Sequence, residues 1–200
     1  EMNLNDDFSS AETDAEIVDN FEKNVYPAIA MRGAVGFVYS EFNLEIGRAQ
    51  SINAIEQALK DDNRVILVTQ KDMAVEKPLQ SDLYYYGLLA EIKKVIYLPG
   101  GGMRIAVKGL EKVQAKEYLS FEPYIEIVYQ PAFEDEGEDV EIIAPAMASV
   151  ESYFEHYSRL NAKISKEQAR QALNAADIPI KIGLIANLIF ATVEEKYAIF

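Results

Sequence analysis

The sequence predicts an α+β fold: a small, mostly antiparallel β-barrel, closed or half-closed, with one packed helix, followed by an α-helical bundle. Strand-like segments with turn residues between them fill residues 24–131 and surround one helical segment. After an acidic stretch at 132–141, apolar residues recur at helical spacing as far as Phe200. We therefore expect a β-rich domain at 24–131 and a helical subdomain at 142–200.

A helix followed by a buried strand forms the centre of the β-rich part. Ile52, Ile55, Ala58 and Leu59 share one face of the predicted helix, as in a helix that lies on a core. The strand that follows, Arg64–Gln70, is β-branched and almost continuously apolar, which is typical of a strand buried on both faces.

The other strand-like segments flank this unit on both sides. They are Tyr26–Met31, Glu41–Ile46, Tyr84–Leu98, Met103–Lys108, Leu110–Tyr118 and Tyr124–Gln130. Gly33 and Gly36 indicate a bend or bulge between the first two segments. Pro99 and the three glycines after it indicate a tight turn, so the strands beside that turn form a hairpin.

The helical part shows its own start signals. One apolar stripe comprises Ile143, Met147, Val150, Phe154 and Tyr157. Capping boxes begin at Ser165 and Thr192, and Pro179 suits the first turn of a helix between them. The last helix stops at Phe200 soon after it begins, so we expect the helical subdomain to be truncated at its C-terminus.

The acidic charge is concentrated in two segments. Residues 1–22 hold eight acidic residues and residues 134–141 hold six, with no Lys or Arg in either stretch. The remaining 19 of the 33 acidic residues match the 19 Lys and Arg. We expect residues 1–23 to be disordered and 132–141 to be an acidic linker. A nearly neutral body disfavours nucleic-acid binding, which needs clustered basic residues.

Several kinds of chemistry lack their sequence signals. The chain has no cysteine, which excludes disulfides and thiolate sites, and no Gly-Lys-Ser/Thr, which excludes a P-loop. His156 is expected on the polar side of a helix, solvated rather than catalytic or metal-bound. No apolar run is long enough for a membrane span, and no secretory signal is visible. We expect no catalytic, cofactor or metal residues, no membrane partner and a cytoplasmic location.

Two features suggest binding to a partner. The first is an aromatic-rich surface comprising Phe37, Tyr39, Phe42, Tyr84, Tyr85 and Tyr86. Because side chains alternate along a strand, Tyr84 and Tyr86 share one face; core packing is the alternative explanation for this set. The second is Arg48 with Gln50, near the polar loop 71–77, for which an ordinary solvated rim is the alternative. An exposed sheet edge is a further route to binding, by strand addition.

Residues 26–131 resemble the N-terminal domain of Lon, the ATP-dependent protease. The patterns that carry the resemblance, in order, are Tyr26-Pro27, Met31-Arg32-Gly33, Gly47-Arg48 with Ser51, Gln70-Lys71-Asp72, Asp82-Leu83-Tyr84 with Gly87, Leu98-Pro99-Gly100 with Arg104, and Gly109-Leu110. Residues 141–200 resemble the helical segment that follows in this family more loosely. The chain departs from the family at Val38 and Asn43, where proline is usual, and at Asp177-Ile178-Pro179.

The resemblance implies a PUA-like barrel joined to a helical bundle, acting as the non-catalytic substrate-recognition and assembly domain of a Lon-type serine protease. It implies unfolded or misfolded client proteins as partners, together with the parent's own ATPase and protease domains in a homo-hexamer. ATP, Mg²⁺ and the Ser–Lys pair that degrades misfolded and regulatory proteins would belong to parts of the parent outside this chain.

Three alternatives to this function remain. One is a stand-alone adaptor with a PUA-like LON domain, which binds a partner protein or a small ligand. A second is RNA binding, which the balanced charge of the body disfavours. A third is a small hydrolase that uses paired carboxylates, for which no pair occurs at a fixed spacing in an apolar setting.

Overall fold

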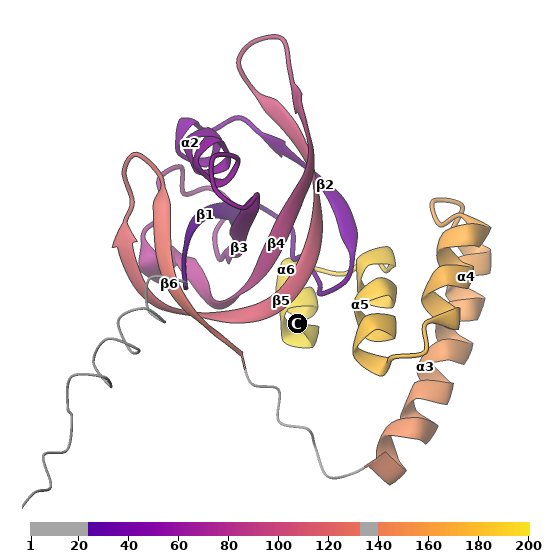
Figure 1. The fold of residues 1–200 in the computed structure, drawn as a ribbon. Coiled ribbons are helices and arrows are strands. Elements are labelled where there is room, and N and C mark those ends of the chain that lie inside the picture. Colours follow the sequence, from indigo (N-terminus) through magenta and orange to yellow (C-terminus); the bar gives the residue numbers. More distant parts are fainter. Residues whose placement is uncertain (1–23, 133–139) are drawn as a thin grey trace, which may run out of the picture.

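The computed structural model describes residues 24–132 and 140–200 (Figure 1). The predicted disorder of 1–23 and most of the predicted linker lie outside these residues. Helix α3 begins at Val140, so the last two residues of the predicted linker are helical. Among the described residues, no helix is both long and apolar enough to cross a membrane.

The strands form one mixed sheet that is mostly antiparallel, and the sequence predicts the antiparallel part. Its members are β1 Val25–Met31, β2 Glu41–Ile46, β3 Arg64–Gln70, β4 Leu83–Tyr97, β5 Met103–Ser120 and β6 Ile125–Pro131. Their order is β2-β5-β4-β3-β1-β6. Only β1 and β3 run parallel, and an additional pairing of β5 with β6 closes the circuit of strands and leaves β2 outside it.

Strand β5 corrects one prediction, because the two expected strands on either side of Gly109 are a single strand of 18 residues. It pairs with β2 through 103–108, with β4 through 103–114 and with β6 through 113–120. Gly109 lies at a close approach of this strand to the Phe37 backbone, where a Cβ atom would overlap the Phe37 carbonyl oxygen. The glycine therefore allows another backbone to approach the middle of β5 and does not end the strand.

The hairpin that joins β4 to β5 is confirmed. Leu98 N–H donates to the Gly102 carbonyl oxygen at 2.8 Å, and Gly101 N–H donates to the Leu98 carbonyl oxygen at 3.3 Å. Gly100 and Gly101 have φ values of 99° and 92°, which residues other than glycine rarely adopt.

Helix α2, Ala49–Ala58, covers one side of the sheet (Figure 1). Ile55 and Ala58 are fully buried on its inner face, as predicted, while Ile52 is only half-buried. Leu59 corrects the predicted stripe: it follows the helix as its C-cap, and 37% of its surface is exposed. Strand β3 is buried from Val65 to Gln70, which confirms the predicted strand with two covered faces.

The helical part consists of α3 Val140–Leu160, α4 Lys166–Asn174, α5 Ile178–Leu188 and α6 Val193–Ile199. Both predicted capping boxes are present, at Ser165 with Gln168 and at Thr192 with Glu195. The apolar stripe predicted for α3 is only partly buried. Met147 and Phe154 are buried, but Ile143 and Val150 are exposed. The buried cluster around Phe154 contains Ile164, Ala172 and Ile185, so the short helices α4 and α5 cover only part of α3.

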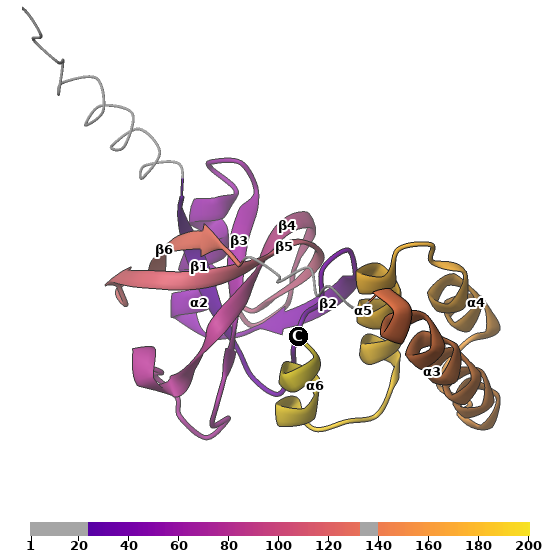
Figure 2. The same cartoon turned by 90° about the horizontal axis from the view of Figure 1, so that it is seen from below.

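The two parts meet at Phe37, in the segment between β1 and β2. Its ring contacts the Phe200 ring edge-on, with centroids 5.9 Å apart, and it clusters with Val35 and Ala186. Gly109 in β5 and Gly183 in α5 approach Phe37 from opposite parts of the fold. In Figure 2, α5 lies between the sheet and the pair α3–α4, and α6 lies below the sheet. Phe37 with its two glycines therefore forms the joint between the sheet and the helices.

We predict that Gly109→Ala destabilises the protein by about 1–3 kcal/mol, because the added methyl group overlaps a backbone oxygen in a packed site. The matched control is Gly47→Ala, since an added Cβ there meets nothing within 4 Å; we expect it to stay within about 0.5 kcal/mol of the parent. Urea unfolding measures both. Equal midpoints for the two variants would contradict the close approach of β5 to Phe37.

Candidate functional site

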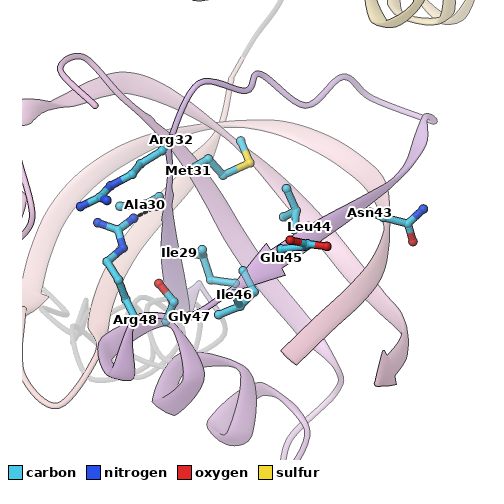
Figure 3. A pocket seen from close by; sticks show the side chains of 11 residues that line it. Ile29, Ala30, Met31, Arg32, Asn43, Leu44, Glu45, Ile46, Gly47 and Arg48 are labelled. Carbon is cyan, nitrogen blue, oxygen red and sulfur yellow. Dashed lines mark hydrogen bonds between the residues drawn. The ribbon is translucent and has the colours of Figure 1, made fainter. Parts of the chain in front are cut away.

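The structure contains two grooves that bring together residues singled out in the sequence. The first, here called the edge groove, lies between segments 29–35 and 42–48, and part of it also borders residues 187–196 of the helical part. It consists of a hollow of about 350 Å³ beside residues 43–48 and a second of about 240 Å³ beside residues 42–44. Figure 3 shows the larger hollow, with β1 on one side and β2 on the other.

Arg48 closes one end of the edge groove. Its guanidinium donates to the carbonyl oxygen of Ala30, to Gln70 Oε1 at 3.2 Å and to the carbonyl oxygen of Glu76 at 3.3 Å. Figure 3 shows the guanidinium of Arg32 beside it. Burial, and secondly the charge of Arg32, lower the pKa of Arg48 from its ordinary value. The predicted proximity of Arg48 to loop 71–77 is therefore correct, and its donors are engaged in fixing that loop to β1.

Gln50 has a similar structural contact. Its Nε2 donates to the carbonyl oxygen of Phe121 at 2.6 Å, which ties the start of α2 to the turn between β5 and β6. Gln50 and Arg48 start from the same end of α2 but bond to different parts of the β-rich domain. Each side chain holds two segments of the fold together through a long-range hydrogen bond.

The second groove, here called the joint groove, lies where the sheet meets α5 and α6. It has a volume of about 460 Å³, and its lining includes Phe37, Val38, Tyr86, Lys112, Pro179, Ile182, Gly183 and Phe200. The Lys112 ammonium lies 5.2 Å from the Tyr86 ring centroid and 5.3 Å from that of Phe200. A cation over aromatic faces at this distance is an attractive contact.

Helix α6 covers part of the predicted aromatic surface. The Tyr197 ring stacks on Tyr84 with centroids 3.9 Å apart, and its hydroxyl accepts from the Tyr86 backbone N–H at 2.8 Å. Burial raises the pKa of Tyr197. Tyr84 is consequently half-buried, although it lies on the same strand as two exposed tyrosines.

Besides the half-buried Tyr84, the predicted aromatic surface is corrected at two further residues. Phe37 is only 4% exposed because it fills the joint, and Phe42 is half-buried against the core beside α2. Tyr39, Tyr85 and Tyr86 are exposed, at 52%, 54% and 38%. The surface offered to a partner is therefore smaller than the sequence predicts and consists of tyrosines.

Tyr39 also has an unusual backbone. Its φ is 61°, in the left-handed region that glycine favours, and its N–H donates to the Gly109 carbonyl oxygen at 3.0 Å. The Gly109 N–H in turn donates to the Ser40 carbonyl oxygen at 2.9 Å. Two residues thus face one, which is a β-bulge, and it turns the chain into β2.

Three residues around the joint groove were not predicted from the sequence: Tyr197, which stacks on Tyr84, and Phe200 and Lys112, which line the groove. The apolar end of the last helix was a signal for the first two, since a solvated helix end would be polar. Among residues 24–132 and 140–200, no group of three or more His, Asp or Glu is placed to hold a metal ion. His156 is exposed on α3, as predicted.

Comparison with known proteins identifies the family. Residues 25–200 match the family model described as the ATP-dependent protease La (LON) substrate-binding domain. The chain is 34% identical over 145 residues to the Lon protease of Brevibacillus choshinensis, covering 72% of this chain and 18% of that protein. It is 31% identical over 179 residues to the Lon protease of Desulforamulus reducens, covering 88% of this chain and 22% of that protein. The chain thus spans about a fifth of the length of these relatives.

The fold has a counterpart among solved structures. The N-terminal domain of Mycobacterium avium complex Lon protease superposes with a TM-score of 0.55 and 13% identity, over 82% of this chain and 100% of that one. This likeness shows the mixed α+β fold, and the sequence matches show the family. The chain belongs to the LON substrate-binding domain family, the substrate-binding part of Lon proteases.

Proposed function

We propose that this chain holds unfolded or misfolded client proteins for an ATP-dependent Lon-type protease and does no chemistry itself. The observation that carries the proposal is the match of residues 25–200, nearly all of the described chain, to a substrate-binding domain. In this proposal ATP, Mg²⁺ and the Ser–Lys pair belong to other domains of a cytoplasmic homo-hexamer. The chain delivers clients to those domains.

We further interpret the sheet as a small barrel of the PUA-like kind. The support is the circuit β5-β4-β3-β1-β6, which returns to β5 through the additional β5–β6 pairing. A sheet closed in this way presents few free strand edges. Client contacts then fall on the grooves and on the exposed side chains around the closed part.

The joint groove and the exposed tyrosines are the side-chain contacts that we assign to clients. Tyr86 forms one wall of the groove, Tyr85 lies beside it with ring centroids 5.1 Å apart, and apolar side chains of α5 form the opposite wall. Unfolded proteins expose apolar and aromatic residues, for which such a surface is complementary. Several weak sites in one hexamer hold a client longer than any single site, because the second contact is intramolecular.

We predict that the purified 200-residue chain binds a permanently unfolded, reduced and alkylated model protein but not its native form. Fluorescence anisotropy of the labelled client measures the binding. The same preparation should release no phosphate from ATP and cleave no peptide. Phosphate release that persists through repeated purification would contradict the division of labour proposed here.

We predict that Tyr86→Ser weakens binding of that unfolded client by about 1 kcal/mol, roughly fivefold in Kd, because an aromatic wall of the groove is lost. The matched control is Tyr153→Ser, which removes an exposed tyrosine from α3, outside both grooves. Both variants should unfold near the parent's urea midpoint. Equal weakening by the two changes would show that the joint groove has no special role.

A further inference from the structure

We propose that the unpaired side of β2 takes up an extended client segment as an additional strand, and that it favours segments with apolar residues alternating with basic ones. The inference rests on the proposed function and adds to it a second site and the chemical class of the segment bound there. The contact is mainly with the client's backbone and is independent of the joint groove.

The hydrogen-bond register of β2 shows which backbone groups are free. The bulge at Tyr39 and Ser40 bonds to Gly109, and the register then runs without a shift from Glu41 opposite Lys108 to Ile46 opposite Met103. Antiparallel pairs alternate between those that exchange hydrogen bonds and those that do not. Counting from Ser40, the pairs bonded to β5 are those of Phe42, Leu44 and Ile46.

The N–H and C=O groups of Glu41, Asn43 and Glu45 therefore point away from β5. Within residues 24–132 and 140–200, β2 pairs with no second strand, and no backbone hydrogen bond outside the β2–β5 ladder engages these three residues. Three successive outward pairs spaced two residues apart are the template that strand addition requires. The edge groove gives space beside them, along residues 42–48.

The opposite wall of the groove is the part of β1 that lies beyond its pairing with β6. β1 pairs with β6 only as far as Ala28 opposite Ile125. The Ala30 carbonyl oxygen, beyond that point, is satisfied by the Arg48 guanidinium instead of a strand (Figure 3). Arg48 therefore occupies this acceptor on the β1 side of the groove, and β2 remains the edge with successive free backbone groups.

The two faces of β2 differ in charge and so set the chemistry of an added strand. Phe42 and Leu44 face the core, and the groove behind them is lined by apolar residues such as Ile29 and Met31. Its charged lining residues are three cations, Arg32, Arg48 and Lys196, and one carboxylate, Glu45, which is paired with Arg104. A client residue that points inward meets apolar contacts, and a basic one there meets like charge. Inward positions therefore favour apolar residues.

The outer face of β2 is acidic. Glu41 and Glu45 are exposed, with Asn43 between them, and Glu45 forms an ion pair with Arg104 on β5. Lys108, which is also on β5, lies opposite Glu41. Side chains directly opposite each other on neighbouring strands interact most strongly. Basic residues spaced four apart on an added strand would each lie beside one glutamate. The carboxylates of β2 would then lie between the basic residues of β5 and those of the added strand.

The test uses a labelled seven-residue peptide of alternating valine and lysine and measures its binding by fluorescence anisotropy. Asn43→Pro removes one outward N–H and keeps the β2–β5 ladder, so binding should fall by about tenfold or more. The matched control, Asn43→Ala, keeps the N–H and should bind within about twofold of the parent. Glu41→Gln with Glu45→Gln should weaken the lysine peptide and leave a valine–serine peptide unchanged.

A second test modifies the peptide and uses the parent chain, so its result does not depend on whether a protein variant folds. N-methylation of alternate peptide amides, on the edge that would face β2, keeps the side chains and removes the donors. It should abolish binding to the parent chain. Equal binding of the methylated and unmethylated peptides, or of the Asn43→Pro and Asn43→Ala variants, would overturn the proposal.

Other outcomes separate this inference from the proposed function. If the Tyr86→Ser variant no longer binds the seven-residue peptide and the Asn43→Pro variant still does, the peptide binds in the joint groove. That result would overturn the edge proposal and leave the proposed function intact. A dimer in sedimentation that Asn43→Pro dissociates would assign the edge to a second copy of this chain. Failure of the unfolded model protein to bind the parent at all would remove the proposed function itself.

Discussion

Strand β5 is the constraint on which the rest of the structure depends. It is long enough to pair with β4 along most of its length and, at its two ends, with β2 and β6 on the other side. The second half closes the circuit through β6, and the first half carries β2, which has no other partner in the described part of the chain. One curved strand thus determines both which edges are sealed and which edge stays open.

Local signals in the sequence were sufficient for much of the fold. Strand β3, the glycine turn before β5 and the capping boxes at Ser165 and Thr192 depend on neighbouring residues, and all are observed. The continuity of β5 was not predictable in this way. The residues around Gly109 are equally consistent with the end of a strand and with a close approach of another backbone. Only the position of Phe37 in the fold distinguishes these two possibilities. Burial on α3 likewise depends on how far α4 and α5 extend.

The candidate site was predicted less well, because its partners lie far apart in the chain. Tyr84 was assigned to a surface, but the helix that covers it begins more than a hundred residues later. Arg48 was placed correctly near loop 71–77, but Gln50 bonds to the turn between β5 and β6 instead, and both side chains donate to the protein's own backbone. Asn43 was noted only as a departure from the proline usual in the family. In the structure its N–H belongs to the open edge, a donor that proline would lack.

The joint at Phe37 has a mechanical consequence. A Cβ added at Gly183 would already lie 3.1 Å from Phe37 Cβ, and Gly109 leaves still less space on the other side. Helices and sheet therefore cannot slide past each other by the width of one methyl group without breaking this contact. Through Phe37 the position of α5 is set directly against β5, the strand that also carries β2.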